Sequence, residues 1–200
     1  MTRLLVFSAF VVAAAAGACR GERDRTILQP SAKPTESSDH AAGEPYPRRD
    51  KSMSDLQAIA DRVEIEALRG EFTDAVMVRD YDRLASLFTE DGAVRIPGVD
   101  SETTSREGIR AGVERLQGLW EYFVQNTHPG MIQLDGDIAV GRAYMSEFGR
   151  LRDGSSHLNY AIYHDRYQRT PDGWKFAERI YEVRYVDTTP LAGSAHNIPS

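Results

Sequence analysis

The distribution of hydrophobic residues divides the chain into a helical part and a strand part. Between residues 53 and 120, apolar side chains recur at intervals of three and four, whereas from 122 to 186 they alternate with polar ones. Ser54 or Asp55 can cap the first series. Its apolar members are Leu56, Ile59, Ala60, Val63, Leu68, Phe72, Ala75 and Val76. The series predicts one long helix at the start of the folded region.

Two shorter helices and a strand are predicted before residue 121. Polar residues at 80–82 end the long helix, and the apolar residues within 84–88 indicate a short second helix. A turn at 90–92 precedes a strand at 93–96, which a Pro-Gly pair stops. A third helix is expected to begin near Ser105 and to extend to about Trp120.

The second half of the domain has the pattern of antiparallel hairpins. Runs rich in Tyr, Val, Ile and Phe are separated by turn residues at 135–136, 153–155 and 171–173. Helices followed by a meander of strands indicate an α+β fold. We therefore expect three N-terminal helices packed on one face of a curved, mostly antiparallel sheet.

The first 52 residues differ in character from the rest. Residues 1–19 have a basic start, an apolar run and small residues before Cys19, as in a secretory signal or a lipoprotein signal with Cys19 as the lipidation site. Residues 20–52 carry four prolines and no apolar period, which predicts a disordered linker. We therefore expect an exported protein with a possible lipid anchor, the folded domain over 53–193 and a tail over 194–200. The alternative is a cytoplasmic protein whose translation begins at Met53.

Composition excludes several functions. The net charge is −6, without a basic cluster interleaved with aromatic residues, so nucleic acid is not an expected partner. The single cysteine rules out an intrachain disulfide, and the sequence contains no glycine-rich phosphate loop. His157 and His164 are an odd number of residues apart on one predicted strand, so they cannot chelate one metal ion without a bulge. Neither a cofactor nor a metal is expected.

Several motifs together resemble one family. Residues 79–84 (RDYDRL) with 87–92 (LFTEDG), 125–128 (QNTH), 135–137 (DGD) and 172–176 (DGWKF) occur in the order and spacing of SnoaL-like proteins of the nuclear transport factor 2-like superfamily. The resemblance covers residues 53–193. It implies a cone that holds a small hydrophobic molecule, cofactor-free proton transfer in the catalytic members, and a homodimer formed through the exposed sheet face.

Two residues are the candidates for catalysis. His128 matches the histidine that dehydratase-like members use as base, and the alternative is that it fixes the turn at 127–129 through a backbone hydrogen bond. Glu147 is the one carboxylate on a small, apolar face of its strand, so it is a candidate general acid. The alternative for Glu147 is an ion pair with an arginine near the strand end.

Six residues are the candidates for substrate binding. On the first helix, Phe72 and Met77 replace a pocket tyrosine and an aspartate that many catalytic relatives have, which makes this side of the cavity apolar. Arg179 would orient an anionic or carbonyl oxygen, or would form an ion pair with Asp165 or Glu178. The other candidates, which would line an aromatic pocket or serve sheet packing or a dimer face, are Tyr144, Tyr160 and Tyr163.

Two classes of function follow from these residues. The first is a cyclase, isomerase or dehydratase that acts on a hydrophobic compound, with His128 as the base and Glu147 or Tyr160 as hydrogen-bond donor. The second is a non-catalytic domain that binds a ligand or a protein partner. Met77 and Phe72 favour the second class, whereas His128 and the polar strand residues favour the first.

Overall fold

The computed structural model describes residues 52–97 and 101–195. The N-terminal segment to which the signal, lipidation and linker predictions apply, including Cys19, lies outside the described residues. The helices and strands are, in chain order, α2 (Met53–Val78), α3 (Tyr81–Ser86), β1 (Phe88–Ile96), β2 (Ser101–Thr104), α4 (Arg106–Gln117), β3 (Trp120–His128), β4 (Ile132–Asp135), β5 (Ile138–Leu151), β6 (Ser156–Thr170) and β7 (Gly173–Asp187).

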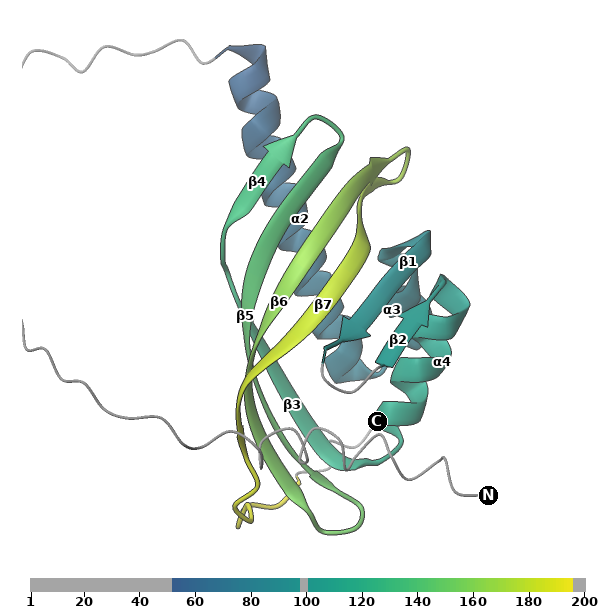
Figure 1. Ribbon diagram of the computed structural model, residues 1–200, viewed down its shortest axis with the longest axis vertical. Coiled ribbons are helices and arrows are strands. Elements are labelled where there is room, and N and C mark those ends of the chain that lie inside the picture. The colour runs from purple at the N-terminus through teal and green to yellow at the C-terminus, as the bar shows by residue number, and fades with distance from the viewer. Residues whose placement is uncertain (1–51, 98–100, 196–200) are drawn as a thin grey trace, which may run out of the picture.

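Helix α2 confirms the long first helix but begins earlier than expected. Ser52 is the N-cap: its side chain accepts from the Asp55 backbone N–H, and the Asp55 carboxylate accepts from the Ser52 backbone N–H. Ser52 thus belongs to the folded domain rather than to the preceding segment. Leu56 and Val63, which the apolar series includes, are 49% and 64% exposed. The first turns of α2 extend beyond the end of the sheet, where no other described helix or strand covers them (Figure 1).

The segment after α2 differs most from the prediction. Helix α3 ends at Ser86, and Phe88 is the first residue of β1 instead of part of a helix. Residues 90–92, expected as a turn, lie within β1, where the pairing with β7 shifts register between Phe88 and Ala93. Strand β2, which was not predicted, pairs antiparallel with β1. The third helix, α4, begins as expected, with Ser105 as its N-cap.

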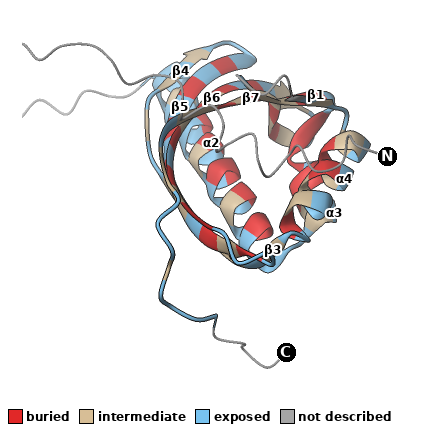
Figure 2. Ribbon diagram, turned by 60° about the horizontal axis from the view of Figure 1, so that its bottom comes forward, coloured by how far each residue is buried: buried red, intermediate tan, exposed pale blue. Residues whose placement is uncertain are grey.

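A seven-stranded sheet forms one layer of the domain. Its order is β2-β1-β7-β6-β5-β3, with β4 paired to β5, and only β1 and β7 are parallel. The predicted hairpin turns are confirmed by positive backbone φ angles at Gly136, Gly154 and Gly173. Because β5, β6 and β7 are long and twisted, the sheet curves around the helices (Figures 1 and 2). The expected α+β architecture is therefore confirmed.

The core lies between the concave face of the sheet and helix α2. Phe72 of α2 contacts the rings of Phe88, Tyr163 and Phe176, with centroids 5.8–6.1 Å apart. Buried residues in Figure 2 line the inside of the curve. Among the described residues, no helix is long and apolar enough to cross a membrane.

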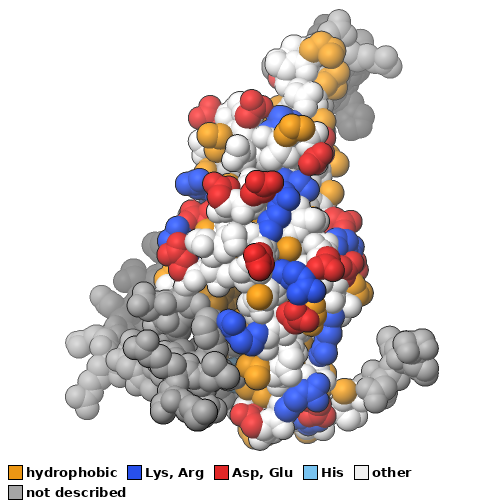
Figure 3. Space-filling view, turned by 90° about the vertical axis from the view of Figure 1, so that its right-hand side faces the viewer, with side chains coloured by type: hydrophobic (Ala, Val, Ile, Leu, Met, Phe, Trp, Pro, Cys, Tyr) orange, Lys and Arg blue, Asp and Glu red, His pale blue; other side chains and the backbone are white. Residues whose placement is uncertain are grey.

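Acidic and basic side chains are interspersed on the face seen in Figure 3. One of the ion pairs in this part of the molecule joins Arg110 and Glu114 on α4, at 2.7 Å. Because charges of both signs mix over the face, this surface presents no single-sign field to a charged partner.

Candidate functional site

A cavity of about 200 Å³ lies between the helices and the concave face of the sheet. Phe72 and Val76 of α2 and Ile109 and Val113 of α4 line its helical side, together with Trp120 at the start of β3. These side chains are apolar, and the buried amide of Gln117 at the end of α4 adds a polar group on the same side. The sheet side is different, because its inward-facing residues include carboxylate, amide, imidazole, guanidinium and phenol groups. The cavity thus has an apolar wall and a polar wall, the arrangement typical of small-molecule sites.

The carboxylate of Glu147 is at the centre of the polar wall. It accepts a hydrogen bond from Asn159 Nδ2 at 3.0 Å, one from Gln125 Nε2 at 3.3 Å and a short one from the Tyr181 hydroxyl. Residue 147 pairs with Gln125 on β3 and with Asn159 on β6, so the strand register itself brings these groups together. Burial, and next the charge of Glu147, raise the pKa of Tyr181, which keeps its phenol protonated and able to donate.

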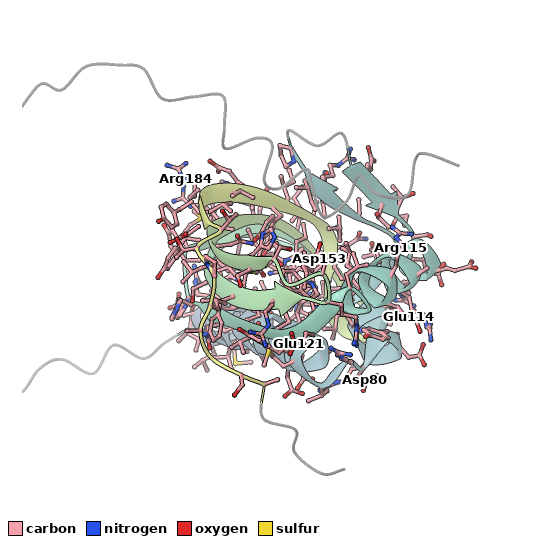
Figure 4. The ribbon with its side chains drawn as sticks, turned by 90° about the horizontal axis from the view of Figure 1, so that it is seen from below. Asp80, Glu114, Arg115, Glu121, Asp153 and Arg184 are labelled. Atoms are coloured by element: carbon pink, nitrogen blue, oxygen red, sulfur yellow. The ribbon has the colours of Figure 1, made fainter. Side chains whose placement is uncertain are left out.

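His157 lines the same cavity from β6. It pairs with Gly149 of β5, two residues from the pair formed by Glu147 and Asn159. Its ring packs edge-to-face against Trp120 with centroids 5.7 Å apart, and the residue is 5% exposed. Burial lowers the pKa of His157, although the nearby charges of Asp153 and Glu147 act in the opposite direction. Asp153 lies in the β5–β6 turn, at the end of the molecule seen in Figure 4.

Arg179 is the buried cation of the polar wall and is 1% exposed. Its Nε and Nη2 donate to the two oxygens of Asp165 at 2.8 and 2.9 Å. Its guanidinium stacks on the ring of Tyr163, 3.8 Å from the centroid, and on Phe72 at 4.3 Å. Arg179 therefore forms the expected ion pair with Asp165, and it also lines the cavity.

A chain of hydrogen bonds from helix α2 to strand β6 fixes Asp165, the ion-pair partner of Arg179. Arg69 of α2 donates through Nε to the Tyr167 hydroxyl at 2.7 Å, and that hydroxyl donates to Asp165 at 2.7 Å. Arg69 and Tyr167 are 2% and 0% exposed. Since Asp165 is fixed by Tyr167 on one side and by Arg179 on the other, the guanidinium has little freedom to rotate.

Three buried polar atoms of the cavity-lining residues have no hydrogen-bond partner in the described part of the chain. They are Gln125 Oε1, Asn159 Oδ1 and Arg179 Nη1. Most buried polar atoms in proteins are paired, because leaving one unpaired costs about 1–3 kcal/mol. Three such atoms around one cavity are therefore evidence of a site that a ligand completes.

His128 and Met77 lie outside this cavity. His128 is exposed at the end of β3, paired with Tyr144, and borders a separate surface groove with Met77 and Asp74. Met77 is 40% exposed, and its sulfur accepts the backbone N–H of Gln125 at 3.2 Å, which covers the edge of β3. The structure therefore does not bring His128 and Glu147 into one space, and no base for the cavity comes from His128.

Five of the predicted substrate-binding residues fall into two groups, one that lines the cavity and one on the outer face of the sheet. Phe72, Tyr163 and Arg179 line the cavity as expected. Tyr144 and Tyr160 lie on the outer face of the sheet, 46% and 51% exposed, because even-numbered residues of β5 and β6 point away from the helices. Their side chains are thus placed for contact with solvent or another molecule, not with a ligand in the cavity.

Four residues of the polar wall were absent from the sequence-based site: Gln125, His157, Asn159 and Tyr181. The available signal was parity, since His157 and Asn159 share a strand face with Tyr163. No pattern within a single strand indicates that Gln125 on β3 and Tyr181 on β7 converge on Glu147. Only the register of the four strands β3, β5, β6 and β7 brings these groups together.

A curved, mostly antiparallel sheet with helices on its concave face is the nuclear transport factor 2-like fold. The matching family model is that of the SnoaL-like domain, over residues 57–180. The chain belongs to this family.

Relatives of known structure or activity agree with this assignment. A gamma-hexachlorocyclohexane dehydrochlorinase of Sphingobium indicum is 30% identical over 149 residues, covering 70% of this chain and 90% of that protein. The structure of a hexachlorocyclohexane dehydrochlorinase from Novosphingobium barchaimii matches with a TM-score of 0.63 and 28% identity, covering 73% of this chain and 99% of the other. A structure from Novosphingobium aromaticivorans, named after scytalone dehydratase, matches with a TM-score of 0.61, 72% and 100% coverage and 19% identity, which shows the fold alone.

Proposed function

We propose that the domain is a cofactor-free acid–base enzyme of the isomerase or dehydratase type, which removes a proton from a carbon atom of a small, mostly apolar compound. The observation that carries this proposal is a buried imidazole, His157, in the same cavity as the carboxylate of Glu147. The relatives named as dehydrochlorinases support it at the level of the family, because the loss of hydrogen chloride also requires removal of a proton.

His157 is the base in this proposal. Because burial lowers its pKa, its imidazole is neutral at ordinary pH and can accept a proton. The imidazolium that forms would be stabilised by the negative charge of Glu147 on the neighbouring strand. Tyr181, Asn159 and Gln125 hold that carboxylate in one orientation.

Arg179 would stabilise the negative charge that develops on the substrate. Its Nη1 has no partner among the described residues, while its other donors are occupied by Asp165. In a β-hydroxy ketone, His157 would take the proton from the carbon between the two functional groups, and the electron pair would move towards the carbonyl oxygen, which faces Arg179. The imidazolium would then return the proton to the departing hydroxyl, so that water leaves and a carbon–carbon double bond remains.

Turnover of 3-hydroxycyclohexanone tests this proposal. The ultraviolet absorbance of the cyclohexenone product would be followed with the wild-type protein, with His157→Gln and with His128→Gln. We expect His157→Gln to lower kcat/KM by about 100- to 10,000-fold, the usual contribution of a general base, and His128→Gln to retain the wild-type rate. Equal rates for wild type and His157→Gln, or loss of activity only in His128→Gln, would contradict the assignment of the base.

One observation favours the alternative of a non-catalytic binding domain. The helical wall of the cavity is mostly apolar, since Phe72 and Val76 line it and Met77 lies outside. A protein that binds small ring compounds but neither dehydrates 3-hydroxycyclohexanone nor exchanges its carbon-bound protons in D₂O would establish this alternative instead.

A further inference from the structure

The unpaired atoms of the polar wall include two acceptors, the amide oxygens of Gln125 and Asn159, beside the one donor nitrogen Arg179 Nη1. An ionised carboxylate only accepts, so Glu147 requires both the Gln125 and the Asn159 amide to turn their NH₂ groups towards it. The amide oxygens must then point elsewhere, and both are without a partner in the described part of the chain. A ligand that completes the wall therefore has to offer a hydrogen to at least one of these oxygens.

The charge of the polar wall is also unbalanced. Asp165 neutralises Arg179 in a two-point ion pair, at 2.8 and 2.9 Å. The hydrogen-bond partners of Glu147 are the uncharged groups of Gln125, Asn159 and Tyr181. Glu147, which is half-buried, thus has no cationic partner among the described residues, and its charge repels a second negative charge brought into the cavity. An anionic ligand would be rejected.

The size of the cavity restricts the ligand further. An apolar cavity of about 150 Å³ accommodates a benzene molecule. The cavity of about 200 Å³ here is somewhat larger, which leaves room for one six-membered ring and one or two small substituents. Its apolar wall, including Phe72 and Trp120, suits the carbon skeleton of such a ring.

We infer that the cavity selects an uncharged single-ring compound with a hydroxyl group, which donates a hydrogen bond to the amide oxygen of Gln125 or Asn159. This inference rests on the cavity of the proposed function and names the class of its ligand. It predicts selectivity for a donor group over an acceptor group, and for a neutral molecule over a carboxylate.

Binding of three matched compounds to the full chain tests the inference. Cyclohexanol, cyclohexanone and cyclohexanecarboxylate share one ring and differ only in the polar group. Isothermal titration calorimetry should give a Kd for cyclohexanol about 3- to 10-fold below that for cyclohexanone, the effect of one added neutral hydrogen bond. Cyclohexanecarboxylate should bind at least about 10-fold more weakly than cyclohexanol. A ketone or carboxylate that binds as tightly as the alcohol, or no binding of cyclohexanol, would overturn the inference.

Variants connect the selectivity to particular atoms. Gln125→Met removes one of the two acceptor oxygens at similar side-chain length, and should reduce the preference for alcohol over ketone. Glu147→Gln removes the negative charge and should raise the affinity for cyclohexanecarboxylate, whereas Glu182→Gln on the outer sheet face should not. If the carboxylate affinity rises equally in both Glu variants, its rejection does not depend on the cavity. Should either cavity variant fail to fold, the comparison of the three compounds on the wild-type protein still tests the inferred ligand class.

This binding test is independent of catalysis. A protein that prefers cyclohexanol but does not turn over 3-hydroxycyclohexanone would retain the inferred ligand class and reject the acid–base function. A protein that dehydrates 3-hydroxycyclohexanone but binds all three compounds alike would support the acid–base function and reject the inferred ligand class.

Discussion

Gly141 leaves open the space that the guanidinium of Arg69 occupies. A Cβ at this position would lie 2.4 Å from Nη2 of Arg69 and 2.8 Å from the backbone oxygen of Met131. That guanidinium is held by Tyr167 and Glu66, so it cannot move aside without losing these bonds. We expect Gly141→Ala to reduce the free energy of unfolding by about 1–3 kcal/mol, as overpacking does in a dense core, measured by urea denaturation.

Gly70 is the matched control for this change. It lies on the exposed side of helix α2, and a Cβ there would meet no atom within 4 Å. Because alanine favours a helix interior more than glycine does, Gly70→Ala should raise the free energy of unfolding by about 0.5–1 kcal/mol. If Gly141→Ala were equally stabilising, Arg69 would not occupy the space above residue 141.

Residue parity explains which site residues were predictable. Glu147, Tyr163 and Arg179 could be found because alternation along a single strand already assigns them to the buried face. His157 carried the same signal, but only the pairing of β6 with β5 shows that it lies close to Glu147. His128 resembles a catalytic histidine by motif, yet the structure places it opposite the exposed Tyr144 at the end of β3. A motif gives the position in the sequence, whereas the face on which a side chain lies depends on pairing between strands.

At the scale of the elements, Asp61 connects helix α2 to the β6–β7 hairpin. Its carboxylate, 5% exposed, accepts from Trp174 Nε1 at 3.2 Å and pairs with Arg169 at 2.7 Å. The hydrogen bond from Arg169 is the main reason that the pKa of Asp61 falls to about 2. Asp61→Asn should reduce the free energy of unfolding at neutral pH by about 1.5–3 kcal/mol, the value of hydrogen bonds to a charged group.

The pH dependence follows from the lowered pKa of Asp61. Its stabilising effect is complete above the pKa of the unfolded chain, near 3.8, and is lost as pH falls towards 2. The difference between wild type and Asp61→Asn should therefore shrink over this interval in urea titrations. Asp137, whose side chain is 80% exposed, also pairs with Arg169 and serves as the control. An equal loss in Asp137→Asn would show that the buried position of Asp61 does not matter.

The elements themselves were predictable where local chemistry determines them. The start of α4 at Ser105 and the turns at Gly136, Gly154 and Gly173 depend on neighbouring residues, and these predictions are confirmed. Strand β1 and its parallel pairing with β7 were not foreseen in full, because residues 90–92 have turn chemistry that the contact with a distant strand overrides. The exposed first turns of α2 likewise depend on the length of the sheet rather than on their own sequence.

For the whole molecule, the outer face of the sheet is the expected homodimer surface. Tyr144, Phe148, Tyr160 and Tyr185 on this face are 39–52% exposed, and the rings of Tyr160 and Tyr185 are 6.1 Å apart. Light scattering on residues 52–200, which keep the Ser52 cap, should give a dimer mass at about tens of micromolar. Tyr160→Lys should shift the mass towards the monomer, whereas Leu56→Lys at the exposed end of α2 should not. A monomer at all concentrations would exclude the dimer.

The central claim is that the cavity around His157 and Glu147, rather than the surface around His128, is the site of this protein. Carbon–proton NMR of the histidine rings during a cyclohexanol titration tests it most directly, with resonances assigned through His157→Gln and His128→Gln. We expect the His157 resonances to shift in a saturable manner while those of His128 stay unchanged. Saturable shifts at His128, with His157 unaffected, would contradict the account.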